Sequence, residues 1–373
     1  MRPSIFEDLF VLELASNHWG KLDRGLKIIS DYGKVVRFNG VRAAMKLQFR
    51  DVPSFIHKDY RNRTDVRYIK KTLDTEMSWE NYALMAKAIR HNCMVTMATP
   101  FDEYSVDKCV ELGVQIIKIG SSDIKDWFLI EKIALTGKPV IASTGGSSLR
   151  DLDDLVSFFG RRNIPFALNH CVSIYPSEDF ELELNQIDFL VARYPDNVIG
   201  FSTHEYSDWR NSMLMAYAKG ARTFERHVDI DDESVPVSPY CSLPQQIDEW
   251  FKAYLKAKEM CGAPGTAKRN PPEKENRYLD ALVRGVYAKQ DLPAGHILAD
   301  ADVFLAIPLL KGQISCREFM RGEVLLNPVR KDAPIGIGDI DSPYATNPGL
   351  RKLIEERGID PEAPKAVGLV AQR

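Results

Sequence analysis

Short β-rich runs alternate with helical segments between residues 10 and 225, and this alternation leaves few folds open. The intervening segments, such as 79–91 and 208–219, carry apolar residues three and four positions apart, as helices packed on a sheet do. Eight such repeats predict an α/β fold, a closed (β/α)8 TIM barrel with its active site at the carboxyl ends of the strands. A doubly wound open sheet is the alternative, but no Gly-x-Gly-x-x-Gly motif follows an early strand. The eight runs are residues 10–15, 43–49, 94–98, 115–119, 139–143, 165–170, 198–202 and 221–225.

A second, smaller unit follows the predicted barrel. The last barrel helix is predicted at 255–260, and the segment 261–273 that follows is rich in glycine and proline, as linkers are. Short runs at 283–288, 303–306 and 324–326 then predict a small, mainly β domain, and residues 349–357 predict a short helix. A domain of about 60 residues buries little surface alone, so we expect this one to pack against something larger. The expected division is a barrel domain at 1–262, a linker at 263–281, the β domain at 282–341 and a C-terminal tail at 342–373.

The amino-acid composition limits the classes of binding partner and the cellular compartment that we expect. The 373 residues are 45% hydrophobic, enough for a large core, and the net charge of −3 leaves no basic stripe for nucleic acid or an anionic membrane. The six cysteines lie far apart without Cys-x-x-Cys spacing, which fits a reducing cytoplasm better than a disulfide framework. The N-terminal residues carry acids where a signal peptide needs an apolar run, and no stretch is long enough to span a bilayer. We therefore expect a cytoplasmic protein.

Two histidines follow the last two predicted strands. His204 comes just after the run 198–202, and His227 just after the run 221–225. Because consecutive strand ends of a barrel meet on one face, the two imidazoles can reach one divalent cation. Either histidine alone is as readily an ordinary loop residue, but the pair favours a metal site.

Two lysines, Lys46 and Lys118, lie within apolar strand-like runs. A buried ammonium is costly unless an anion pairs with it, so one such lysine alone indicates a structural ion pair. Two at corresponding strand ends predict an anionic ligand instead. The hydroxyls of Ser121 and of Ser143-Thr-Gly-Gly146 offer donors to phosphate oxygens, although a tight strand-to-helix turn explains the second motif equally well. Glu13, one strand from Lys46, is placed to hold a substrate hydroxyl or to move a proton.

An ordered series of short motifs resembles the N-acetylneuraminate (sialic acid) synthase family, over residues 10 to about 341. The second unit, with Arg284-Gly-Val-Tyr-Ala-Lys-Gln-Asp-Leu-Pro-Ala-Gly295, resembles the antifreeze-like SAF domain that ends these enzymes. The barrel motifs are Glu13-Leu-Ala-Ser-Asn-His-Trp-Gly20, Lys46-Leu-Gln48, Ala98-Thr-Pro-Phe-Asp102, Lys118-Ile-Gly-Ser121, Ser143-Thr-Gly-Gly146, His170-Cys-Val-Ser-Ile-Tyr-Pro176, Gly200-Phe-Ser-Thr-His204 and Glu225-Arg-His227.

The resemblance implies condensation of phosphoenolpyruvate with the open-chain aldehyde of an amino sugar, giving a 2-keto-3-deoxy sugar acid and phosphate. It implies a divalent metal, Mn²⁺ or Mg²⁺, on His204 and His227 that acts as a Lewis acid on the aldehyde. It also implies a domain-swapped homodimer in which the SAF domain covers the partner's barrel. Glu13 and Asp123 take catalytic positions, and Tyr175 takes an acceptor-binding position. The residues implied to hold phosphoenolpyruvate are Lys46, Gln48, Lys118, Ser121, Ser143, Ser173 and Ser202, with Ser173 at a position where the family often has asparagine.

The chain departs from the family pattern on the acceptor side. Ala306-Ile-Pro308 stands where the SAF domain commonly has Lys-Arg-Pro, whose arginine reaches the sugar's acyl group. Residues 235–243 lack the acid of the family's Gly-Pro-Asp-His motif and carry Ser238 instead. Asp123 stands where glutamate is usual, one methylene shorter. We therefore expect an aldehyde sugar other than N-acetylmannosamine as the acceptor.

Two other functions stay open. A metal-dependent aldolase or lyase on a TIM barrel uses the same histidines, although the anion set of Lys46, Lys118 and Ser143 counts against it unless its substrate is phosphorylated. A non-catalytic carbohydrate-binding homologue keeps the scaffold, although the retention of Glu13 beside both histidines counts against it. Release of inorganic phosphate from phosphoenolpyruvate separates the synthase from the aldolase.

Overall fold

The computed structural model describes residues 4–232, 235–263, 265, 267–343 and 345–361. The chain divides into two compact units, Met1–Pro264 and Gly265–Arg373. Residues 264 and 266 of the predicted linker, and residues 344 and 362–373 of the predicted tail, lie outside the described residues. Within the described ranges, no helix has both the length and the apolar character that crossing a bilayer requires.

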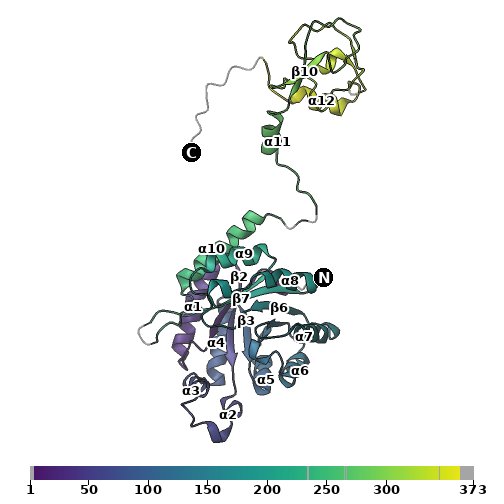
Figure 1. The fold of residues 1–373 in the computed structure, drawn as a ribbon. Coiled ribbons are helices and arrows are strands. Elements are labelled where there is room, and N and C mark those ends of the chain that lie inside the picture. Colours follow the sequence, from purple (N-terminus) through teal and green to yellow (C-terminus); the bar gives the residue numbers. More distant parts are fainter. Residues whose placement is uncertain (1–3, 233–234, 264, 266, 344, 362–373) are drawn as a thin grey trace. The chain divides into compact units, whose positions relative to one another are not determined.

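The first unit is a closed barrel of eight parallel strands in sequential order, which confirms the predicted TIM barrel (Figure 1). The first strand pairs with both the second and the last, so the sheet has no free edge. The strands are β1 (Leu9–Ala15), β2 (Arg42–Phe49), β3 (Val95–Pro100), β4 (Ile116–Ile119), β5 (Val140–Ser143), β6 (Phe166–Cys171), β7 (Val198–Thr203) and β8 (Thr223–His227).

Helices connect the strands on the outside of the barrel, because parallel neighbours need a crossover connection. The connection from β2 to β3 is elaborated by two extra short helices before its main one, and α10 continues the chain after β8. The last helix is longer than the segment predicted at 255–260. The helices are α1 (Leu22–Asn39), α2 (Val52–Phe55), α3 (Arg67–Asp74), α4 (Trp79–His91), α5 (Glu103–Glu111), α6 (Trp127–Leu135), α7 (Leu149–Arg161), α8 (Asn185–Arg193), α9 (Trp209–Ala218) and α10 (Pro244–Cys261), with 3-10 turns at Ser4–Phe6, Lys58–Tyr60, Ser121–Asp123 and Asp179–Glu181.

Side chains alternate between the barrel interior and the helix layer, because successive strand residues point to opposite faces. In β1, Phe10 and Leu12 belong to the large apolar cluster that also takes in helix residues, whereas Leu9 and Val11 belong to a separate inner cluster. The next position in that inward series is Glu13. The same period therefore fills one end of the barrel with apolar side chains and brings polar ones to the carboxyl end. The inner cluster comprises Phe6, Leu9, Val11, Ala44, Met97, Ile116, Ile141, Ala167 and Val198.

The second unit is small and mainly β, as predicted. β9 (Gly285–Ala288) pairs antiparallel with β10 (Val303–Ala306), and β11 (Val324–Leu325) pairs antiparallel with β12 (Ile340–Asp341). α12 (Pro348–Glu356) follows, next to the helix predicted at 349–357, and its Ile354 is fully buried in this unit's apolar cluster. Arg357 pairs with Glu318 at 2.7 Å, so the segment after residue 341 packs on the rest of this unit. α11 (Glu273–Asp280) lies within the predicted linker and buries no side chain.

Candidate active site

Polar side chains gather at the carboxyl ends of the barrel strands, and most of them are almost fully buried. They occupy the inward positions that follow the apolar inner cluster. A large buried polar surface of this kind is unfavourable unless its groups pair with one another or with a ligand. The exposed fractions are 2% for Glu13, 3% for Lys46, 2% for Lys118, 3% for Ser143, 3% for Ser202, 3% for His204 and 4% for Glu225.

The two predicted lysines converge on one carboxylate. Lys46 Nζ donates to Glu225 Oε1 at 2.8 Å and also pairs with Glu13. Lys118 Nζ lies 3.4 Å from the same Glu225 carboxylate and donates to Ser143 Oγ at 2.5 Å. Each lysine therefore has a structural partner, and both ammonium groups stay available to a further anion.

The four charged groups have different proton affinities. Burial raises the pKa of Glu13, and the attraction of Lys46 offsets this only in part. Burial also opposes ionisation of Glu225, but the ammonium groups of Lys118 and Lys46 outweigh it and lower its pKa. Burial lowers the pKa of Lys118, whereas Glu13 and Glu225 outweigh burial at Lys46 and raise its pKa. Glu225 is thus the acid of the cluster that stays ionised, and Glu13 is the acid that more readily holds a proton.

A group of hydroxyls and one thiol lies beside Ser143. Cys171 Sγ lies 3.8 Å from Ser121 Oγ and 3.9 Å from Ser173 Oγ. A Cβ atom at Gly145 would overlap Ser173 Oγ and would lie 2.7 Å from Ser121 Oγ, so glycine is needed for these hydroxyls to lie so close to the backbone. The structure thus brings together Ser121 and Ser173, which the sequence assigned to phosphoenolpyruvate, whereas Ser143 contacts Lys118.

Two other predicted residues have partners of their own. Gln48 Oε1 accepts a hydrogen bond from Arg50 Nη1 at 3.2 Å, at the end of β2. Asp123 lies in the 3-10 turn after β4 and accepts from Ser122 Oγ at 3.0 Å. Burial raises the pKa of Asp123 to about 6.

The two predicted metal ligands lie side by side. The ring centroids of His204 and His227 are 5.4 Å apart, and Tyr175 packs on His204 with centroids 3.9 Å apart. Burial lowers the pKa of His204 to about 4, and burial together with the charge of His204 lowers the pKa of His227 well below its usual value. Both rings are therefore neutral near pH 7, the form that binds metals.

His204 and His227 can provide two ligands to a divalent cation, whose other ligands would have to come from water or substrate. His204 Nδ1 donates to Val172 O at 3.0 Å, which leaves its Nε2 lone pair free. Among the described residues, no group of three His, Cys, Asp or Glu side chains is arranged to hold a metal. A cation here would therefore bind two imidazole nitrogens and complete its shell with oxygens of water and substrate, as Mg²⁺ commonly does.

Comparison with known proteins decides the family. The NeuB family matches residues 39–264, and the SAF domain matches residues 283–341. The chain belongs to the NeuB family. This confirms the resemblance found in the motifs, and the SAF match gives the second unit its name.

Named relatives and a solved structure match this NeuB chain over 64% to 90% of its length. A putative spore coat polysaccharide biosynthesis protein E from Chromobacterium violaceum is 33% identical, with a TM-score of 0.85 over 90% of this chain and 100% of that one. N-acetylneuraminate-9-phosphate synthase of Drosophila melanogaster is 30% identical over 254 residues, 64% of either chain. N,N'-diacetyllegionaminic acid synthase of Campylobacter jejuni is 25% identical over 305 residues, 79% of this chain and 89% of its own.

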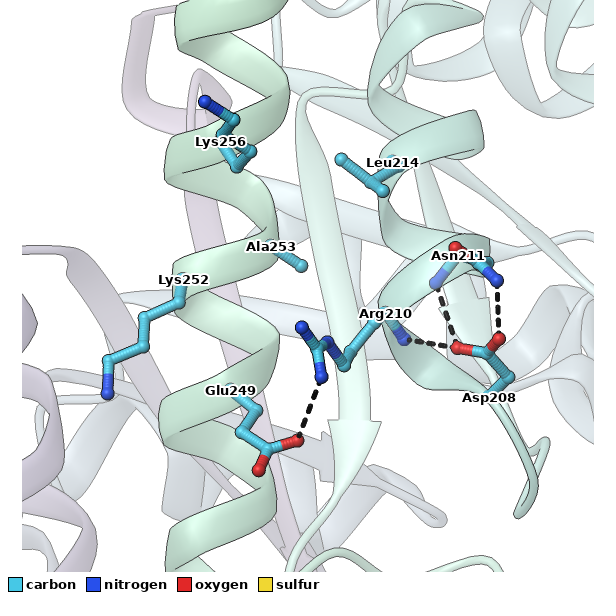
Figure 2. Close-up of a pocket in the computed structure, with 8 residues that line it drawn as sticks. All are labelled: Asp208, Arg210, Asn211, Leu214, Glu249, Lys252, Ala253 and Lys256. Atoms are coloured by element: carbon cyan, nitrogen blue, oxygen red, sulfur yellow. Dashed lines mark hydrogen bonds and ion pairs between the residues drawn. The ribbon is translucent and has the colours of Figure 1, made fainter. Parts of the chain in front are cut away.

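A hollow of about 630 Å³ between α9 and α10 lies apart from the NeuB strand ends. In Figure 2, Arg210 points to Glu249, 3.9 Å away, and Asp208 accepts from Asn211. Lys252 pairs with a neighbouring aspartate on its own helix. Because these charges satisfy one another on the outer helices, the hollow is not the candidate site. Its lining is Asp208, Arg210, Asn211, Leu214, Glu249, Lys252, Ala253 and Lys256.

One residue of the NeuB site received no role from the sequence. Glu225 stands at an inward position two residues before His227, and it is the carboxylate that both lysines share. Two inward lysines need more than one inward acid, Glu13 supplies one, and the need for a second is the signal by which Glu225 could have been assigned.

Proposed function

We propose that this chain condenses phosphoenolpyruvate with the open-chain form of an aldose, giving a 2-keto-3-deoxy sugar acid and inorganic phosphate. The observation that carries the proposal is the pair of buried lysines on one glutamate, beside hydroxyls and two neutral histidines, in a NeuB chain. The relatives named as synthases of N-acetylneuraminate 9-phosphate and of diacetyllegionaminic acid support a sugar acid as the product.

The donor half of the site suits phosphoenolpyruvate. Lys46 and Lys118 provide positive charge at the bottom of the site, and Ser143 is already bonded to Lys118. The hydroxyls of Ser121 and Ser173 lie against the backbone at Gly145 and would donate to phosphate oxygens. Gln48 and Ser202 complete the proposed donor set, with Gln48 released from Arg50 when the ligand binds.

The acceptor half suits an aldehyde. His204 and His227 would hold Mn²⁺ or Mg²⁺, which when bound polarises the aldehyde carbonyl as a Lewis acid. In the overall reaction, carbon 3 of phosphoenolpyruvate bonds to the aldehyde carbon, water adds at carbon 2, and phosphate leaves with the bridging oxygen. Glu13 is the proposed proton carrier for the addition at carbon 2, and Asp123 assists from the loop after β4. Tyr175 borders the acceptor beside His204.

We further propose a cytoplasmic homodimer in which the SAF domain covers the partner's barrel. All six cysteines lie in the described part of the chain and are unpaired, as in reduced proteins. Large apolar side chains on the SAF unit are exposed, Ile297 by 64%, Ile307 by 61% and Leu326 by 56%, which supports a further contact surface. Light scattering coupled to gel filtration tests the dimer, and a monomer at micromolar concentration contradicts it.

Two measurements test the activity. Phosphate release from phosphoenolpyruvate is followed with a panel of aldoses and Mn²⁺, and it should require an aldose. Phosphoenolpyruvate should also raise the melting temperature of the wild type by mass action, and Lys118→Met should remove that shift. A metal-dependent aldolase or lyase, the alternative, would instead depend on the metal at His204 and His227 but would release no phosphate from phosphoenolpyruvate. Absence of both the melting shift and phosphate release overturns the proposal.

A further inference from the structure

One aromatic ring beside the histidines has no part in the proposed mechanism. The ring centroid of Tyr240 lies 5.1 Å from that of His227, with the planes at 84°. It lies 5.3 Å from that of Tyr175, with the planes at 77°. Because Tyr175 packs on His204, the four rings form a continuous corner in which two tyrosines border two imidazoles. We call this set the aromatic corner.

The segment that carries Tyr240 is held in place without a ligand. Ser242 N donates to His227 O at 2.9 Å, and Asp229 N donates to Ser242 O at 3.1 Å, so the segment runs beside the end of β8. The hydroxyl of Tyr32 in α1 reaches the carbonyl oxygens of both Asp229, at 2.7 Å, and Ser242, at 2.5 Å. Tyr32 is fully buried, and Ser242 is 1% exposed. A ring presented by an anchored segment loses little conformational freedom when a ligand binds.

The chemistry of the corner suits the carbon skeleton of a sugar. Tyr240 is half-buried, and Tyr175 is 51% exposed, so part of each ring faces solvent. Burial raises the pKa of the Tyr240 hydroxyl, but the side chain of Ser238, in the same segment, lies close enough to offset part of that rise, so the polar end of the residue lies toward its own segment. What remains for a ligand is the ring itself, a weakly polar surface that packs against carbon-bound hydrogens and leaves sugar hydroxyls to water.

We propose that Tyr240 is a specificity-determining residue for the acceptor, with its ring packed against the carbon chain of the aldose whose aldehyde lies at His204 and His227. This inference rests on the proposed synthase function, which is what brings a sugar aldehyde to the histidines. The contact selects among aldoses and leaves the donor untouched, because Lys46 and Lys118 lie on β2 and β4, and Ser121 and Ser173 follow β4 and β6, whereas Tyr240 follows β8.

Three variants test the contact by kinetics. Tyr240→Ala removes the ring, Tyr240→Phe keeps it, and Tyr206→Ala removes a more exposed tyrosine, 43%, whose hydroxyl donates to Glu178 at 2.9 Å outside the aromatic corner. Tyr240→Ala should raise the KM of the best aldose in the panel by about tenfold, as loss of one aromatic contact does. The KM of phosphoenolpyruvate should stay the same, and the phosphoenolpyruvate-induced melting shift should show that the variant is folded. Tyr240→Phe and Tyr206→Ala should behave as the wild type does. An unchanged aldose KM in Tyr240→Ala overturns the assignment.

A second measurement needs no turnover. Saturation-transfer NMR from the protein's aromatic protons is recorded with mannose and N-acetylmannosamine as probes, in the presence of phosphoenolpyruvate. Transfer to the carbon-bound sugar protons should occur in the wild type and in Tyr240→Phe, and should be lost in Tyr240→Ala. Transfer without any phosphate release overturns the synthase function but keeps Tyr240 as a sugar contact. Turnover with transfer that persists in Tyr240→Ala overturns the role of Tyr240 alone, and absence of both transfer and turnover in the wild type overturns both.

Discussion

The Glu225 carboxylate lies 2.8 Å from the Lys46 ammonium group inside the barrel, and both residues are at most 4% exposed. The same carboxylate lies 3.4 Å from Lys118, so one anion serves two buried cations. Burial raises the pKa of Glu13, the other acid of the cluster, and weakens its contribution of negative charge. Burial also lowers the pKa of Lys118, so Glu225 and Lys46 are the two members that hold their charges most firmly. A bound anion would give the two ammonium groups a second partner beside the one carboxylate that they share.

Replacing Glu225 with glutamine should test this account directly. The variant keeps the shape of the side chain and removes the shared charge, so we expect the free energy of unfolding to fall by about 3 to 5 kcal/mol in urea titrations, as for other broken buried ion pairs. Phosphoenolpyruvate or phosphate brings negative charge to the same lysines. Either ligand should therefore recover more stability in Glu225→Gln than it adds to the wild type.

The matched control for this variant is Glu205→Gln. Glu205 is fully buried and pairs with Arg226 at 3.1 Å, between β7 and β8 but outside the donor site. Its loss should lower stability by a similar amount, without any added recovery from phosphate. Equal recovery in the two variants would contradict a ligand role for the lysine cluster.

We predict that removing either histidine of the pair lowers the affinity of the protein for Mn²⁺. Alanine at His204 or His227 removes one of two protein ligands, so Mn²⁺ affinity should fall by more than the roughly 10- to 100-fold that loss of an outer-shell partner costs. Titration of Mn²⁺ by electron paramagnetic resonance measures this without turnover. His170→Gln is the control, because His170 is buried nearby but hydrogen-bonds Leu182 O at 2.7 Å. Unchanged Mn²⁺ affinity in both alanine variants would make the pair structural.

Gly145 predicts a steric effect on the donor. A methyl group at this position would push against the hydroxyls of Ser173 and Ser121, so Gly145→Ala should raise the Kd of phosphoenolpyruvate by about tenfold or more. Calorimetric titration measures the Kd, and the melting temperature without ligand checks the fold. Gly160→Ala, in α7, has no atom within 4 Å of the added methyl and should leave the Kd unchanged. Equal donor affinity in the two variants would remove Ser121 and Ser173 from the phosphate site.

From the raised pKa of Asp123 we predict that the free energy of unfolding depends on pH. Burial raises its pKa from 3.8 to about 6, so the folded state binds a proton that the unfolded state has released between these values. Its contribution to stability is full below about pH 4 and is lost as the pH rises through 6. Asp123→Asn does not titrate, so its stability relative to the wild type should increase over that window, by up to about 3 kcal/mol, and then stay level. Urea unfolding from about pH 4 to 8 measures this difference, and a difference that does not change with pH would refute it.

The pattern of apolar and polar residues within single strands was sufficient to predict the barrel and the positions of several polar side chains at the strand ends. Residues such as Lys46, Lys118 and Ser143 stand out because a polar side chain follows apolar inward positions in the same strand, and a period of two places it at the carboxyl end. The apolar inner cluster beneath them comes from the same period. These features lie within single strands, so they can be predicted without knowing the strand pairing.

The remaining features depend on contacts that are distant in the sequence. Glu225 meets Lys46 across 179 residues, because β8 closes the barrel against β1. The aromatic corner arises in the same way, from Tyr175 and Tyr240 on two different loops. α11 was read as linker because its sequence, EKENRYLD, carries no apolar stripe and buries nothing, so no periodic signal marks it.

The last prediction concerns the acceptor sugar. Ile307, 61% exposed, stands where the SAF domain commonly has arginine, and Ser238 stands where the family's motif has an acid. A site that pairs a substrate's polar groups discriminates by up to about 10⁴-fold against analogues that lack them, so the loss of both charges should change the preferred substrate. N-acetylmannosamine should therefore have a lower kcat/KM than an aldose with other substituents, for example one without the acylamino group. A panel of aldoses assayed for phosphate release ranks them, and Ile307→Arg should improve N-acetylmannosamine relative to the best of the panel. If N-acetylmannosamine ranks first in the wild type, other residues replace the two missing charges and this specificity argument is wrong.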